Sequence, residues 1–374
     1  MSQNIIYHVS EVEAKKDTYQ SFDNLDFIIN CGEGRSLVPN SVEIIGELQV
    51  RDNASRSTNN HIFFDPITGI HSFVDSIQTQ FIDGPAVGSK ENIQNYARFV
   101  SMLEQSTKAP ESAYSGSMVA ELKSNSEQAT VAYSKGRNAQ GTGGAALIKD
   151  QDFSFKPVCM LNRMSGDPLP FEKSGQIRLT VNLATNASAL MGGQFSNSQD
   201  DYQWRNVRVN YVSVQTKNGK NAQSFRTVYN VKSSVQSNFA NVQMSVPAVC
   251  RSCSVSFQRQ SEEQQTPHSN YKCDRPRNLE EVQFLFNDST SQYISYVISD
   301  KTEMLERYIE SFRDTEDNML SGSRYNSQRA FGVGLSFAGY TDLSQQKFAV
   351  QIKSGATSQQ SYNMYLYFHS LLQM

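Results

Sequence analysis

Apolar and polar residues alternate along much of this chain, and the alternation predicts β-strands. From Ile177 to Leu183 every second side chain is apolar and those between are polar, as in a strand with one buried face. The same period predicts strands at 42–50, 207–211, 282–286 and 348–352. The run from Tyr362 to Phe368 carries aromatic residues at both parities, which predicts a strand buried on both faces.

Two segments follow the spacing of a helix instead. Residues 91–105 predict a helix with Ser89 as its N-cap, because apolar side chains recur mostly three or four apart, at Ile93, Tyr96, Ala97, Val100 and Leu103. Residues 302–314 predict a second helix, in which Asp300 and Glu303 form a capping-box-like start. Its stripe comprises Met304, Leu305, Tyr308, Ile309 and Phe312. Core packing explains both stripes, and neither presents a set of ligands.

The order of these elements occurs twice along the chain. A strand region leads into a helix at 68–105 and again at 281–313, and further strands follow each helix. We therefore predict a duplicated β-domain, although any large all-β chain can be aligned with itself in this manner. The polar segment Gly192–Asp201 is the expected boundary. The predicted organisation is an N-terminal arm at 1–24, a first domain at 25–195 and a second domain at 196–374.

Composition is consistent with this organisation. A chain of 374 residues can form two domains with sizeable cores, and its 17 Tyr and 21 Phe favour strands. The net charge of −3 gives no indication of specific nucleic-acid binding, and the nearby cations Arg205, Arg208, Lys217 and Lys220 favour a solvated surface. We see no secretory signal and no apolar run of about 20 residues that could span a membrane. The odd count of five cysteines favours a reducing compartment.

The sharpest candidate for chemistry is a set of possible zinc ligands. The set begins with a C-x2-C pair and comprises Cys250, Cys253, His268 and Cys273. The pair lies in a segment that is predicted to be a strand, where residues three apart point to opposite faces. Free thiols are therefore the favoured interpretation, with a zinc site or a redox pair as alternatives.

Other candidate sites are weaker. A second metal or acid/base hypothesis combines His61, Asp65, His71 and Asp75, which are expected to flank a hairpin. Cys31 and Cys159 are isolated, and no GxSxG or HExxH motif is present. We therefore predict no catalytic, cofactor-binding or metal-binding residues and favour a protein that is not an enzyme.

Several segments resemble one family. The first half contains PNSVEIIGELQV, IFFDPITGIHSFVDSIQTQF, ENIQNYARFVSML and KPVCMLNRMSGDPLPFEKSGQIRLTVNLA. The second half contains RNVRVNYVSV, FLFNDSTSQYISYVISDKTEMLERYIESF and FGVGLSFAGYTDLSQQKFAVQI. In order and spacing these segments resemble the double jelly-roll major capsid proteins of polinton-like viruses, virophages and the adenovirus and tectivirus lineage. The resemblance covers most of residues 38–370, and no single motif in it is specific.

The resemblance implies an all-β fold of two side-by-side eight-stranded jelly rolls, each with a short helix in a connecting loop. It implies a structural virion protein whose homotrimer forms a pseudo-hexagonal capsomer in an icosahedral shell assembled inside the host cell. The implied partners are neighbouring capsomers, minor capsid and vertex (penton) proteins, and an inner membrane contacted through the N-terminal arm. The alternatives are a minor capsid or vertex subunit, or a β-sandwich carbohydrate-binding or hydrolytic protein.

Overall fold

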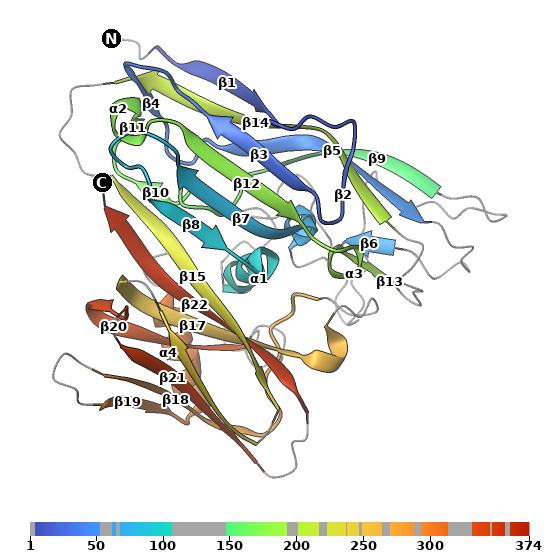
Figure 1. Ribbon diagram of the computed structural model, residues 1–374. Coiled ribbons are helices and arrows are strands. Elements are labelled where there is room, and N and C mark those ends of the chain that lie inside the picture. Colours follow the sequence, from blue (N-terminus) through green and yellow to red (C-terminus); the bar gives the residue numbers. More distant parts are fainter. Residues whose placement is uncertain are drawn as a thin grey trace.

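The chain folds into two β-sandwiches that stand side by side (Figure 1). The computed structural model describes residues 4–52, 62–64, 68–106, 147–192, 201–216, 223–236, 238–246, 249–263, 270–287, 293–312, 331–344, 346–355 and 360–373. All structural statements below concern these residues. No helix among them is long and apolar enough to span a membrane.

The first sandwich consists of two sheets of antiparallel strands. Sheet 1A has, across its width, the order β1 (Ile6–Glu11), β14 (Asp201–Gln215), β5 (Glu43–Asp52) and β9 (Leu147–Phe155). Sheet 1B has the order β3 (Asn24–Ile29), β12 (Ile177–Leu183), β7 (Val74–Phe81) and β8 (Lys90–Ile93). The short strands β2 (Tyr19–Gln20), β4 (Arg35–Leu37) and β11 (Leu169–Pro170) extend sheet 1A, and β6 (Ile62–Phe64) with β13 (Leu190–Gly192) forms a separate two-stranded sheet.

The second sandwich repeats this arrangement. Sheet 2A has the order β15 (Ser224–Val235), β22 (Tyr362–Gln373), β17 (Val249–Arg259) and β20 (Gly332–Asp342). Sheet 2B has the order β16 (Phe239–Ser245), β21 (Lys347–Ser354), β18 (Leu279–Asn287) and β19 (Tyr293–Ile298). One strand of the first half, β10 (Met164–Ser165), pairs with β15 and so joins the edge of sheet 2A.

The two sandwiches correspond strand for strand. In chain order each contributes its first, third, sixth and eighth main strands to one sheet and the remaining four to the other, which is the jelly-roll topology. A longer helix follows the fifth main strand in both: α1 (Tyr96–Ser106) and α4 (Lys301–Ser311). The remaining helical turns are η1 (Gly69–Phe73), α2 (Phe171–Ser174), α3 (Asn186–Ala189) and η2 (Gln260–Glu262). The prediction of two eight-stranded jelly rolls with one short helix each is confirmed.

Strand pairing changes the predicted boundaries. Strand β14 lies beyond residue 195 but pairs with β1 and β5, so it is the last strand of the first sandwich and not the first of the second. The predicted arm at 1–24 is likewise wrong in part, because β1 and β2 both pair with β14. These contacts join residues about 200 positions apart and leave no local trace in the sequence. The change from one sandwich to the other follows Gln215.

The helix predicted at 91–105 begins later than expected. Residues Lys90–Ile93 form β8, because they pair with β7 and Ile93 lies opposite Ile77. Asn95, with φ of +50°, turns the chain from the strand into α1, so Ser89 is not a helix cap. The second helix begins as predicted, since the Asp300 carboxylate accepts hydrogen bonds from the backbone N–H groups of Thr302 and Glu303.

Antiparallel pairing sends consecutive main strands toward two opposite ends of each sandwich. The first strand starts, and the last strand finishes, at what we call the terminal end, and Figure 1 places both chain ends on the same side. The connections after the first, third, fifth and seventh main strands lie at the opposite, distal end. The described residues of these connections include 68–73, 270–278 and 299–312.

Candidate functional site

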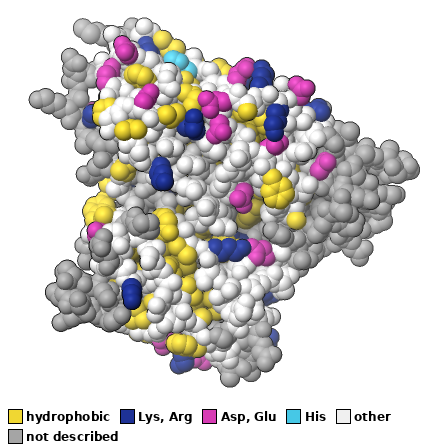
Figure 2. All heavy atoms as spheres, in the orientation of Figure 1, with side chains coloured by type: hydrophobic (Ala, Val, Ile, Leu, Met, Phe, Trp, Pro, Cys, Tyr) yellow, Lys and Arg dark blue, Asp and Glu magenta, His cyan; other side chains and the backbone are white. Residues whose placement is uncertain are grey.

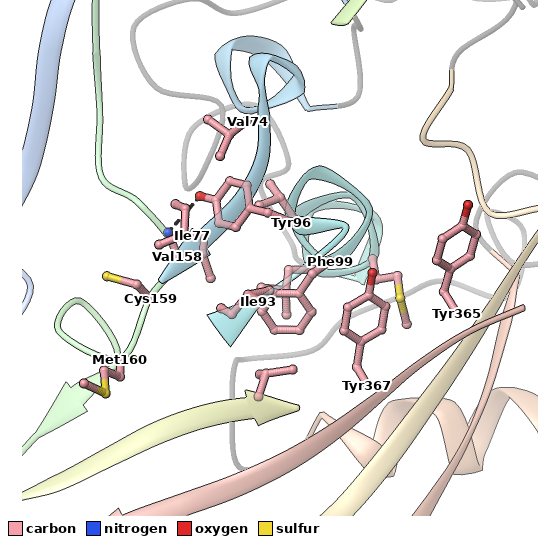
Figure 3. Close-up of a cluster of buried hydrophobic side chains, with 14 of the residues drawn as sticks. Val74, Ile77, Ile93, Tyr96, Phe99, Val158, Cys159, Met160, Tyr365 and Tyr367 are labelled. Atoms are coloured by element: carbon pink, nitrogen blue, oxygen red, sulfur yellow. Dashed lines mark hydrogen bonds between the residues drawn. The ribbon is translucent and has the colours of Figure 1, made fainter. Parts of the chain in front are cut away.

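The feature that most constrains function is the junction between the two sandwiches. It is formed by α1, β8 and the segment after β9 from the first sandwich, which lie against β15, β22 and β17 of sheet 2A (Figures 1 and 3). Every described side chain of α1 is buried, from Tyr96 to Leu103. A helix that is covered on all sides belongs to the interior of a larger body, so α1 connects the cores of both sandwiches.

Aromatic side chains fill the centre of the junction. Phe99 of α1 lies 5.2 Å from Tyr367 of β22 between ring centroids, and the Tyr367 hydroxyl donates to the Asn95 carbonyl at 3.1 Å. Phe81 of β7 and Phe225 of β15 meet edge to face at 6.0 Å. Figure 3 shows the rings of Phe99 and Tyr367 beside the cluster around Ile93, Tyr96 and Val158. Contacts of this kind resist separation of the sandwiches, because pulling them apart would expose large apolar rings to water.

Arg98 of α1 is the main polar anchor of the junction. Its guanidinium is buried and donates hydrogen bonds to the carbonyls of Lys272 and Asn270 and to the Gln258 side chain, all in the second sandwich. It also stacks over the Tyr365 ring, 4.9 Å from the centroid. Burial lowers the pKa of Arg98, but nearby Tyr365 and other groups that can carry negative charge outweigh this effect and raise it. The arginine therefore stays charged while it fixes the orientation of the two sandwiches.

Glu91 of β8 is a second polar anchor. Its carboxylate accepts hydrogen bonds from the backbone N–H of Met160 at 2.6 Å and of Val228, on β15, at 3.0 Å. Burial raises the pKa of Glu91 to about 7, against the opposing effects of the Arg163 charge and the two N–H donors. A buried acid that bridges two sandwiches makes the junction sensitive to pH near neutrality.

The second sandwich contributes one further element to the junction. The segment 270–274 runs along the first sandwich, where the Asn270 amide donates to the Ala187 carbonyl at 2.9 Å. The Tyr271 hydroxyl donates to the Ser72 carbonyl at 3.2 Å. The junction therefore involves the sheet face and this distal connection together.

Equivalent surfaces elsewhere on the chain are uncovered. Sheet 2A is covered by the first sandwich, whereas the corresponding sheet 1A has exposed apolar side chains on the outer face at its edge. Figure 2 shows one face of the molecule, on which apolar side chains are exposed between charged ones. On its edge strand β1, Tyr7 is 80% exposed and Val9 is 62% exposed, and both point to this outer face next to Val212 and Asn210. Exposed apolar side chains grouped on one sheet face are typical of an interaction surface.

The strand that corresponds to β8 is also uncovered. In β8 the side chains of Glu91 and Ile93 are buried in the junction. In its counterpart β19, Tyr296 lies on the same face as the buried Ile298 and is 44% exposed. Among the described residues, the counterparts of both junction surfaces, on sheet 1A and on β19, thus carry exposed apolar side chains.

The residues proposed as zinc ligands do not form a site in the part of the chain that the structure describes. Cys250 and Cys253 lie in β17 opposite Thr341 and Leu335, and all five cysteines are buried free thiols. No group of three or more His, Cys, Asp or Glu side chains among the described residues could hold a metal ion. His268 lies outside those residues.

The second metal hypothesis also lacks a described site. His61 and Asp65 lie outside the described residues. His71 is fully buried, its Nδ1 lies 2.8 Å from the Tyr96 hydroxyl, and burial lowers its pKa to about 3. Burial raises the pKa of both Cys31 and Cys159 to about 12, which disfavours a thiolate nucleophile at either position.

The basic residues considered earlier are not gathered into a described groove. Arg205 and Arg208 lie in β14, on either side of a register irregularity in its pairing with β5. Lys217 and Lys220 lie outside the described residues.

Sequence comparison finds no matching family model and no matching curated protein. Structural comparison finds likeness over the whole chain. The Faustovirus major capsid protein has a TM-score of 0.63 at 8% identity, with 100% of this chain and 90% of that chain covered. The Sputnik virophage structure gives 0.59 at 10%, with 99% and 86% covered, and the PBCV-1 capsid gives 0.57 at 9%, with 100% and 95% covered.

At these identities the likeness is one of fold. It extends over both sandwiches, in agreement with the strand orders of all four sheets and the helix in each half. The chain therefore has the fold of the double jelly-roll major capsid proteins of large DNA viruses and virophages.

Proposed function

We propose that this protein is a major capsid subunit, which acts by self-assembly and not as an enzyme. The proposal rests on one observation. Two equivalent sandwiches meet in a junction within the chain, and among the described residues the counterparts of both junction surfaces, on sheet 1A and on β19, carry exposed apolar side chains. The solved structures of the same fold, which are viral capsid proteins, support it.

The contact within the chain joins two different surfaces. The β8 side of one sandwich meets the face of sheet 2A on the other. A contact between unlike surfaces, repeated between equivalent units, produces a closed ring or an open helix. If β19 of one copy docks on the outer face of sheet 1A in the next copy, six similar sandwiches from three chains can close a pseudo-hexagonal ring.

This assembly accounts for the exposed apolar residues. Tyr296 on β19 would be covered by the neighbouring copy, as Ile93 on β8 is covered within the chain. Tyr7 and Val9 on β1 would be covered by the same contact. The implied partners beyond the trimer are neighbouring capsomers and minor capsid or vertex proteins in a virion shell assembled inside the host cell. Because β1 and β2 belong to sheet 1A, residues 6–20 do not supply the free arm that membrane contact was expected to use.

The experiment is a native mass measurement on the purified chain and two matched variants. The wild-type protein should run near 126 kDa, about three times 42.0 kDa, or as a larger assembly. Val9→Asp places a charge on the open face of sheet 1A and should give a monomer of 42.0 kDa with an unchanged melting temperature. Val87→Asp is the control, since Val87 is also 62% exposed but lies in the turn between β7 and β8. A wild-type monomer, or a Val9→Asp trimer, would refute the proposal.

A further inference from the structure

A second surface, whose described lining residues all belong to the second sandwich, has the chemistry of an anion-binding site. A hollow of about 640 Å³ lies at the distal end of the second sandwich. Its walls come from the end of β17, the connection before β18, the start of α4 and the residues before β22. The lining includes the four cationic side chains of Arg259, Arg275, Arg277 and Lys301.

Most of this positive charge is not neutralised inside the described part of the chain. Arg259 is paired with Glu262 at 2.9 Å, and Glu280, the acidic residue in the lining, is paired with Lys353 at 3.5 Å. Arg275, Arg277 and Lys301 form no ion pair with any described residue. Three unneutralised cations around one hollow repel each other, and a bound anion would relieve that repulsion.

Several contacts hold the cations in position. The Arg275 guanidinium lies over the buried ring of Phe331, 5.5 Å from its centroid. The Arg277 backbone N–H donates to the Tyr362 hydroxyl at 3.0 Å, which fixes the loop to the start of β22. The backbone N–H groups of Thr302 and Glu303, in the first turn of α4, are already engaged by Asp300, so the ligand would be held by side chains and not by the helix end. An anchored guanidinium is suited to a tetrahedral oxyanion, to which it can donate two parallel hydrogen bonds.

We propose that this hollow binds a tetrahedral oxyanion, namely a sulfate or phosphate group. Nucleic acid is disfavoured as the carrier of that group, because the described lining residues include no aromatic side chain that could stack on a base. The ion can be free in solution or carried as an ester on a polysaccharide. The proposal does not depend on the capsid function, since the site lies within one sandwich.

The test is calorimetric titration of the purified full chain with inorganic sulfate, inorganic phosphate and a sulfated oligosaccharide of defined length. Arg277→Gln and Lys301→Gln remove one charge each from exposed positions. Each should weaken binding roughly tenfold, the usual loss for one charge-assisted hydrogen bond. Lys347→Gln is the control, because Lys347 starts β21 at the terminal end of the same sandwich, and it should leave the affinity within about twofold.

Each outcome has a defined meaning. Binding of the inorganic ions identifies a free oxyanion, and binding of the oligosaccharide alone identifies an ester-bearing carrier; either supports the site if the two variants lose it. No saturable binding, binding that all variants retain, or tighter binding of a single-stranded oligonucleotide of equal charge would overturn the proposal. Native mass should be unchanged in all three variants, so failure of the site and failure of the assembly proposal are separately visible.

Discussion

Glu91 should make the stability of the folded chain depend on pH in a direction opposite to that of most carboxylates. Burial raises its folded pKa to about 7 from an ordinary value of 4.5. Between these two values the folded state binds more protons than the unfolded state, so the free energy of unfolding falls as pH rises. The contribution is fully favourable below about pH 4.5 and is lost as pH rises through 7.

The magnitude follows from the two pKa values. A shift of this size corresponds to about 3 kcal/mol between the protonated and ionised limits, and to about 2.5 kcal/mol between pH 5 and pH 8. Two buried histidines oppose this trend, since burial lowers the pKa of both His71 and His369 to about 3 and each destabilises the fold on acidification. The pH dependence of the free energy of unfolding therefore combines opposing contributions. The difference in this free energy between wild type and Glu91→Gln isolates the contribution of Glu91.

The assay is urea unfolding at pH 5 and pH 8, at fixed protein concentration, followed by the fluorescence of Trp204. This is the only tryptophan of the chain, and it is fully buried in the first sandwich. At pH 5 the wild-type Glu91 carboxyl group is protonated, so the neutral amide of Glu91→Gln, which also has one carbonyl acceptor, should change the stability little. Relative to wild type, the stability of this variant should rise by about 2.5 kcal/mol between pH 5 and pH 8.

The control is Glu306→Gln on the exposed side of α4, which should leave the pH dependence of the wild type unchanged. Equal pH dependence in wild type and Glu91→Gln would refute the reasoning, whatever the absolute stability of the variant. That result would mean that the carboxylate is as well solvated by Arg163 and its two N–H donors as it is by water.

Three further predictions test the packing. Arg98→Met leaves two buried carbonyls and one side-chain oxygen without their donor and should cost about 3 kcal/mol in urea unfolding; a loss below about 1 kcal/mol would contradict the anchor. Gly332→Ala should cost about 1–3 kcal/mol, because a Cβ there would lie 2.3 Å from the Tyr308 ring of α4, whereas Gly339→Ala, with no atom within 4 Å, should cost much less. A thiol reagent should react with fewer than one cysteine per native chain and with all five in urea, and a chelator should leave the melting temperature unchanged; rapid native labelling or chelator sensitivity would contradict buried, metal-free thiols.

Local patterns in the sequence predicted the strands well. Period-2 alternation placed β12 and β21, because one face of each strand packs in a core. The same rule failed at 90–93, where Ile93 fits a strand and a helix equally and only pairing with β7 decides. The boundary after Gln215 was missed for a related reason, since the partner of β14 is β1 at the other end of the first half.

The junction itself was not predictable from composition or motifs. Arg98 and Glu91 resemble solvated charges in the sequence, yet both are buried between the sandwiches. One signal was available: Arg98 stands between Ala97 and Phe99 on a helix whose other positions are mostly apolar. A charge inside such a segment is costly unless distant groups satisfy it, and those groups come from residues 258–272, which no local pattern connects to α1.

The two helices differ in a manner that limits how closely assembly can repeat the internal junction. Helix α1 is buried on all sides against sheet 2A, whereas α4 lies on β20 of its own sandwich, where Gly332 and Gly334 allow close approach. Leu305 and Ile309 of α4 stay half-buried. A contact between copies would therefore use β19 without a fully enclosed helix beside it. Such a contact buries less apolar surface than the internal one, so the trimer should dissociate before the two sandwiches of one chain separate.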